Sequence, residues 1–417
     1  MRLAAIFTVA LAVWPQIAMA QQAVVLDRYL SPTAGTADLL TVQHEIVALE
    51  DRVLPLKLGD EQRRLPHLAG IFYRTAKFVG IDVPQDHMLL VLGHEVFGHG
   101  ARLRELGVGR IGYSFDGPLP YGAGGAATSF VGEFPATPLA SLAVEMAGIE
   151  AQNTIVDAIA ETALARGRIH YREAWLYVES RYLGMTYMLS ATVRSEEGHD
   201  VADFFRTFKE ACGSPDCQPI TLGDLRNGAR LTLADPLLYF SLYGIASSYV
   251  AHGTATSPLP MIPFGHSIRF LPSVGFHMTP YGTEHLFRSV FVSGERNEGR
   301  GAGRNVTSVT LRLGTTGAST PWAVDVRATD VHLFRGIHVG AAADIWRQPP
   351  IFADHTSAPL KTGAAAAMTL VLPLGSFVHE DWLKATITGG YKSAGFVPGE
   401  QLQRGVTFRA GVTLASQ

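Results

Sequence analysis

The hydrophobic pattern of this chain changes its period near residue 255. Before that point, apolar residues recur at helical spacing in long segments such as 86–106 and 139–165, which Pro and Gly residues separate. After it, apolar and polar residues alternate, as in 309–313 and 406–414. A segment whose hydrophobic residues repeat at helical spacing does not form a stable strand, and a segment in which they alternate does not form a stable helix. We therefore predict an α+β, two-domain fold.

The domain boundaries follow from composition. Arg2, an apolar run over 3–17 and the Ala18-Met19-Ala20 site are typical of a secretory signal peptide, so we assign residues 1–20 to one and expect an exported protein. Residues 21–254 form the predicted helical domain, 255–266 form a linker rich in Pro and Gly, and 267–417 form the β domain.

The β domain contains about eight alternating runs, each long enough to cross a bilayer as a strand. Residues 260–417 resemble an outer-membrane β-barrel, which turns its apolar face to lipid and its polar face inward. That resemblance implies an antiparallel barrel in the outer membrane, with lipid as a partner and the helical domain on the periplasmic or outer side. The chain ends Leu414-Ala415-Ser416-Gln417, without the terminal aromatic residue usual in such barrels. A soluble periplasmic sandwich or barrel is the alternative.

Composition limits the partners and the redox state. The formal net charge is −3, which argues against nucleic acid as a partner. Charged residues make up 17% of the chain, a low fraction that is compatible with a surface facing lipid. Cys212 and Cys217, the two cysteines, lie close together in ACGSPDC, and an exported protein is expected to join them in a disulfide.

The chemistry is concentrated in the segment DHMLLVLGHEVFGHGARLRELG, which holds His94, Glu95 and His99 within an apolar helix. On a regular α-helix, His94 and His99 point about 140° apart, whereas residues four apart differ by only about 40°. Two arrangements follow. A π-bulge would bring both histidines to one face as joint metal ligands. In a regular helix, Glu95 and His99 would be the ligands and His94 would orient them.

This segment resembles the active-site helix of the zincin metallohydrolases, in which H-E-x-x-H supplies two zinc ligands and a general base. Gly93 and Gly98, next to the two histidines, also resemble that family. The spacing here is one residue longer. The resemblance implies one Zn²⁺ ion held by His94 and His99, with Glu95 as the catalytic general base that activates a water molecule.

A third ligand is expected from the helix predicted at 139–165. Its polar residues Glu150, Asn153, Asp157 and Glu161 share one face. By the zincin resemblance Glu150 is the ligand, with Asn153 or Asp157 supporting it. Glu145 is the other candidate ligand. A solvated polar face is the competing interpretation for Asp157 and Glu161.

Other residues are expected to support the site. His170, and Tyr182 or Tyr187, are candidates to reach it. The Gly-rich segment between the two site helices is predicted to be a hairpin or long loop that lies along the cleft.

These features predict an exported metal-dependent hydrolase, with zinc metallopeptidase as the leading function and a peptide or envelope component as the substrate. A hydrolase of envelope lipid or glycan with the same metal site is one alternative. A non-catalytic outer-membrane binding or structural protein, whose histidines are hydrogen-bonded core residues, is the other.

Overall fold

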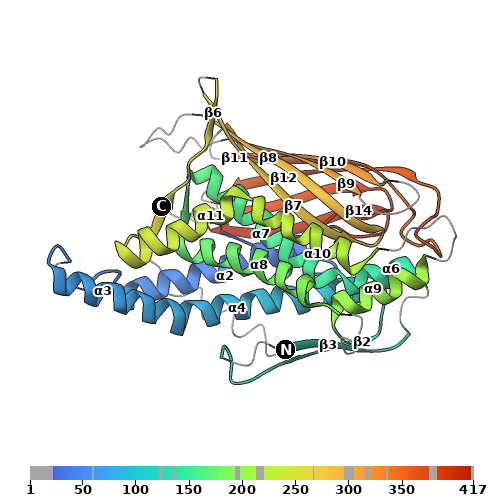
Figure 1. The fold of residues 1–417 in the computed structure, drawn as a ribbon. Helices are drawn as coiled ribbons and strands as arrows, with labels where there is room; N and C mark the ends of the chain where they lie inside the picture. The colour runs from blue at the N-terminus through green and yellow to red at the C-terminus, as the bar shows by residue number, and fades with distance from the viewer. Residues whose placement is uncertain are drawn as a thin grey trace.

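The computed structural model packs a layer of helices against the concave face of one large antiparallel sheet, which confirms the α+β class (Figure 1). The predicted signal peptide lies outside the described residues. Those residues are 22–58, 61–121, 125–133, 137–192, 198–212, 220–265, 267–294, 305–314, 320–334, 337–374 and 383–414.

The helical elements include three stretches of π-helix, which are η1, η2 and η4. From Arg64 to Glu105 the helices follow one another without a break, because the residues at each junction keep helical backbone angles. Among the described residues, no helix is both long and apolar enough to cross a membrane. The elements are α2 (Pro32–Val53), α3 (Arg64–Lys77), η1 (Phe78–Asp82), α4 (Val83–Leu92), η2 (Gly93–His99), α5 (Gly100–Glu105), α6 (Pro138–Glu145), α7 (Ala147–Arg166), α8 (Tyr171–Ser190), α9 (Asp200–Ala211), α10 (Leu222–Arg230), the 3₁₀-helix η3 (Leu231–Ala234), α11 (Pro236–Tyr243) and η4 (Gly244–Ala251).

The large sheet has ten strands in the order β1-β14-β13-β12-β11-β10-β9-β8-β7-β6, all antiparallel. Two small two-stranded sheets, β2-β3 and β4-β5, lie apart from it. The strands are β1 (Gln22–Asp27), β2 (Arg110–Phe115), β3 (Ala126–Val131), β4 (Arg168–His170), β5 (Thr256–Pro258), β6 (Ile262–Phe264), β7 (Ile268–Thr279), β8 (Gly282–Ser293), β9 (Asn305–Gly314), β10 (Trp322–Phe334), β11 (Ile337–Gln348), β12 (Lys361–Pro373), β13 (Leu383–Lys392) and β14 (Gly405–Leu414).

The predicted closed barrel differs from the structure. Among the described residues, the strands form an open sheet whose outer members are β1 and β6. Helix α2 packs beside β1, while α10, α11 and η3 pack beside β7. Helices thus contact β1 at one end of the strand order and β7, next to the short exposed strand β6, at the other. The N-terminal strand β1, from the region predicted to be helical, is also part of this sheet.

The concave face of the sheet is the polar one, and it receives the polar side of α7. Arg288 of β8 forms ion pairs with Asp157 and Glu161 of α7, and Ser308 of β9 donates a hydrogen bond to Glu161. Other buried charged residues on this face are Glu284, Arg312, Asp325, Asp344, Lys392 and Arg409. Since side chains alternate across a strand, the apolar residues between them point outward.

The outward face is apolar and exposed. Met368, Val406 and Phe408 are 60%, 73% and 61% exposed, respectively. The register places them beside other outward apolar residues, such as Ile387 and Tyr391. The hydrophobic core of the molecule lies elsewhere, mainly among the helices and where α7, α8 and α10 meet the sheet.

Replacing Arg288 by Met should weaken the attachment of α7 to the sheet. The substitution removes the ion-pair partner that Asp157 and Glu161 share, which we expect to cost about 2 kcal/mol in the free energy of unfolding. Thermal or denaturant unfolding of the purified chain measures this, with Arg168→Met at an exposed position as the control. Equal stability of the two variants would show that these ion pairs do not hold the helix.

Candidate metal centre

The helix that carries the H-E-x-x-x-H sequence widens into a π-helix, η2, over Gly93–His99. The N–H of Gly100 donates to the carbonyl of Glu95, five residues earlier, which is the hydrogen bond that defines a π-turn. As a result, the Nε2 atoms of His94 and His99 lie 3.2 Å apart. The predicted π-bulge is therefore present, and the alternative of a regular helix in this turn is wrong.

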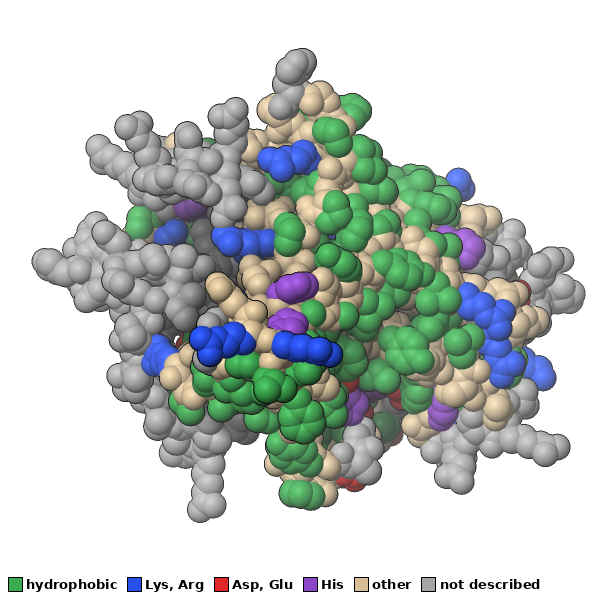
Figure 2. Space-filling view, turned by 60° about the vertical axis from the view of Figure 1, so that its left-hand side comes forward, with side chains coloured by type: hydrophobic (Ala, Val, Ile, Leu, Met, Phe, Trp, Pro, Cys, Tyr) green, Lys and Arg blue, Asp and Glu red, His purple; other side chains and the backbone are tan. Residues whose placement is uncertain are grey.

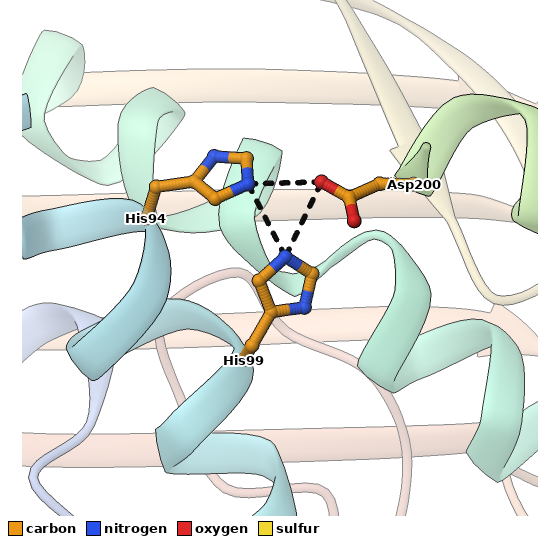
Figure 3. A group of neighbouring side chains, drawn as sticks. All are labelled: His94, His99 and Asp200. Carbon is orange, nitrogen blue, oxygen red and sulfur yellow. Dashed lines mark hydrogen bonds and ion pairs between the residues drawn. The ribbon is translucent and has the colours of Figure 1, made fainter. Parts of the chain in front are cut away.

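Asp200, the first residue of α9, completes a group of three potential ligands (Figure 3). Its Oδ2 atom lies 2.9 Å from Nε2 of His94 and 3.3 Å from Nε2 of His99. Neighbouring ligand atoms of a tetrahedral zinc ion with bonds of about 2.0–2.1 Å are about 3.3 Å apart. The three atoms therefore form a triangle of the size that one such ion requires, and a fourth position is left for water or substrate.

Two glycines let the helices approach closely enough to form this group. A Cβ atom at Gly98 would lie 2.6 Å from the carbonyl oxygen of Ala147 in α7. A Cβ atom at Gly148 would lie 2.2 Å from Nε2 of His94. Any larger residue at either position would push η2 away from α7 or displace the His94 ring.

Neighbouring groups fix the orientation of the ligands. Nδ1 of His99 donates to the carbonyl of Val144 at 2.8 Å, which leaves Nε2 with a lone pair for a metal. Nδ1 of His94 lies 3.2 Å from the side-chain amide of Gln152. The backbone N–H of Asp200 donates to the hydroxyl of Tyr187 at 3.1 Å. Each ligand thus has a second contact that holds it in place.

The electrostatics couple Asp200 to the histidines. Burial lowers the pKa of His99, but the charge of Asp200 and its hydrogen bond outweigh burial and raise this pKa to about 9. Burial raises the pKa of Asp200, but the two histidines hold it well below its usual range. The carboxylate therefore stays ionised at neutral pH, as a metal ligand must. A bound cation would take the place of the His99 proton.

Glu95 lies buried beside this group, and the β2-β3 hairpin covers it. Its Oε2 atom accepts a hydrogen bond of 2.6 Å from the hydroxyl of Thr128 in β3. The charge of Glu95 is one of the smaller contributions to the raised pKa of His99. The Gly-rich segment thus forms the predicted hairpin, and its strand β3 packs directly on η2.

Glu150, the expected third ligand, is not brought to the histidines. Its carboxylate forms a buried ion pair with Arg102 and accepts a hydrogen bond from the N–H of Gly399. Asp157 and Glu161 pair with Arg288 of the sheet, so they do not form a solvated face. Asn153 lies with Ser180 of α8 around a small cavity.

The remaining candidates are divided between the site and other parts of the fold. Glu145 lies near it: burial raises the pKa of this carboxyl to about 7, and its Oε1 accepts a hydrogen bond from Thr207. Tyr187 contacts Asp200, whereas Tyr182 is 54% exposed on α8. His170 caps α8 together with Glu173, away from the group. Cys212 is disulfide-bonded, and Cys217 lies outside the described residues.

Sequence reasoning missed Asp200. An Asp directly before an apolar helix is usually read as a helix-capping residue, and Asp200 stands in that place before 201–212. In the structure its carboxylate points to the histidines. The histidine that it contacts lies 106 residues earlier in the chain, and no local sequence pattern marks such a long-range partner.

Comparisons with known proteins identify no relative for this chain: no family model, no curated protein and no solved structure matches it.

Replacing Gly148 by Ala should weaken metal binding while the fold persists. The new methyl group would displace the His94 ring, and we expect at least about a tenfold loss of Zn²⁺ affinity. Titration against a chromophoric chelator measures this. Gly80→Ala is the control, because a Cβ atom there meets nothing within 4 Å. Unchanged affinity in Gly148→Ala would mean that His94 is not a ligand.

Proposed function

We propose that this protein is a metal-dependent hydrolase, with His94, His99 and Asp200 as the ligands of one divalent ion. The observation that carries the proposal is the convergence of these three side chains on one triangle beside the buried Glu95. Two imidazoles and one carboxylate suit Zn²⁺, and three protein ligands with an open fourth position are typical of catalytic zinc sites.

A divalent ion held here would supply Lewis acidity, which lowers the pKa of a water molecule and polarises a carbonyl group. In the proposed reaction, the carboxylate of Glu95 accepts a proton from water as the water oxygen attacks the carbonyl carbon. Glu95 then passes that proton to the leaving group, so that the bond to the leaving group breaks and the carboxylate is restored. The hydroxyl of Thr128 holds Glu95 in place through the 2.6 Å hydrogen bond.

A peptide is the substrate class that we favour. Strand β3 packs on η2, and among the described strands its only partner in the ladder is β2. An extended peptide can pair with a free strand edge, which would hold a scissile carbonyl beside the site. An envelope lipid is the second candidate, because the exposed apolar face of the large sheet favours a location in or on a membrane.

Metal analysis and one conservative variant test this function. The mature chain should carry about one zinc ion, which is lost in His94→Ala, His99→Ala and Asp200→Asn. Glu95→Gln should keep the ion but lose at least about a hundredfold in hydrolysis of a peptide and lipid panel. Thr186→Ala, on the exposed part of α8, is the activity control. Zinc retained in both histidine variants, or full activity of Glu95→Gln, would overturn the proposal.

We further propose that the protein is exported and that the outward face of the sheet contacts the lipid of the outer membrane, with the helical domain on the periplasmic or outer side. Strands β7 to β14 are 10 to 13 residues long, sufficient to span a bilayer. Their charged residues gather on the concave face, while the outward face exposes apolar residues such as Leu311, Ile345 and Met368. A soluble monomer rarely exposes an apolar surface of this extent.

Other exposed apolar residues lie on the helices. Leu68 and Phe72 of α3 are 52% and 76% exposed, and Tyr243 of α11 is 64% exposed. Figure 2 shows hydrophobic side chains gathered over much of one face of the molecule, with few acidic side chains among them. These residues favour a helical layer that also touches the membrane.

Two substitutions on one strand test this location. Met368→Arg places a charge near the middle of the outward face, whereas Thr362→Arg places it on the same face at the end of β12. We expect a cost to membrane insertion of about 2–4 kcal/mol for Met368→Arg and about 0–1 kcal/mol for Thr362→Arg. The difference is measured as the amount of folded protein that is recovered in the membrane fraction. A wild-type chain that is monomeric in plain buffer would overturn the location.

A further inference from the structure

A cavity of about 480 Å³ lies between β1, α5 and the segment that leads into β14. One wall is apolar and consists of Leu26, Val406 and Phe408. These side chains are 60%, 73% and 61% exposed, and the strand register puts them on the outward face of the sheet. The cavity therefore opens onto the same apolar surface that we propose to contact lipid.

The acidic residues of the cavity already have cationic or backbone partners. Asp27 and Glu400 both form ion pairs with Arg409. Glu105 forms an ion pair with Arg102 and accepts hydrogen bonds from the backbone N–H groups of 402 and 403. Arg409 is shared by two carboxylates, and Arg102 is shared by Glu105 and Glu150, so these groups keep a net negative charge that only further cations of the cavity can offset.

Two exposed arginines also line the cavity. Arg28 follows β1, and Arg404 precedes β14. Among the described residues, neither of these two side chains forms an ion pair. Arginine binds phosphate with two parallel hydrogen bonds, so a pair of such side chains beside an apolar wall suits an amphiphile with an anionic head.

The same end of the sheet has the composition of a membrane interface. Trp322 and Tyr391 point outward there, one at the start of β10 and the other near the end of β13. Arg347, at the end of β11, is exposed on this outward face. Lys361, the exposed first residue of β12, pairs with Gln348 and belongs to the opposite face of the same sheet end. Aromatic and basic residues typically gather where a protein passes from hydrocarbon to lipid headgroups.

We propose that this cavity binds the phosphate headgroup of an anionic phospholipid, with Arg28 and Arg404 on the phosphate and the acyl chains along Leu26, Val406 and Phe408. This proposal rests on the membrane location proposed above and not on the hydrolase chemistry. The cavity also includes Ala101 and Arg102, which follow His99 in the chain by two and three residues. A bound lipid therefore lies against the helix that continues directly from the metal site.

Lipid titration of the full mature chain in neutral detergent tests the site. Dioctanoyl phosphatidylglycerol should bind saturably at about one molecule per chain, as measured by calorimetry. The double variant Arg28→Gln/Arg404→Gln should weaken this binding at least about tenfold, whereas Arg168→Gln, which removes an exposed arginine on β4, should leave it unchanged. Because both altered arginines are exposed, we expect the melting temperature of the double variant to stay at the wild-type value.

The comparison ligands separate the possible sources of the anion. Dioctanoyl phosphatidylcholine should bind at least about tenfold more weakly, and inorganic phosphate should not displace phosphatidylglycerol at equal concentration. Displacement by inorganic phosphate would mean a site for free anions and would overturn the lipid assignment. Equal binding by the double variant, or equal binding of both phospholipids, would overturn the cavity as a headgroup site. In that case, insertion into membranes and zinc content would still test the proposed location and function independently.

Discussion

The attachment of α7 to the sheet determines the arrangement of everything else. Asp157 and Glu161 point toward the strands and meet Arg288, so the polar side of the sheet must face the helices. Strand alternation then turns the apolar side outward. The other end of the same helix carries Gly148, against which the His94 ring is seated. One helix thus contacts both the polar face of the sheet and the candidate metal centre.

The alternation of residues after position 255 was sufficient to predict long antiparallel strands, because a period of two is a local property. It could not predict whether the sheet closes, which depends on long-range packing. The N-terminal strand β1 joins β14, and α2 then occupies the space beside it. Nothing in the sequence of 22–27 points to a partner almost four hundred residues away. Barrel closure was therefore the wrong expectation, although the polar and apolar faces of the strands followed from the pattern.

At the site, spacing was more informative than composition. The extra residue between Glu95 and His99 allowed two arrangements, and the structure has the π-helical one. The polar stripe on α7 was recognised correctly as a polar face, but its role was misread. Glu150 forms an ion pair with Arg102, while the third candidate ligand is Asp200, whose position at the start of a helix is typical of a capping residue. A carboxylate that contacts residues far away in the sequence leaves no recognisable pattern among its own neighbours in the chain.

The π-turn also acts as a spacer in the rotation of the chain. Each residue advances an α-helix by about 100°, and the π-turn takes up one extra residue between Glu95 and His99 without that rotation. If the same residues formed a regular α-helix, α5 would be turned by about that angle relative to α4. Arg102 would then point away from Glu150, and the contacts of α5 with the segment before β14 would be lost. The π-turn therefore keeps the candidate metal centre and the contacts of α5 in the same rotational phase, so a change that straightened this turn would disrupt both together.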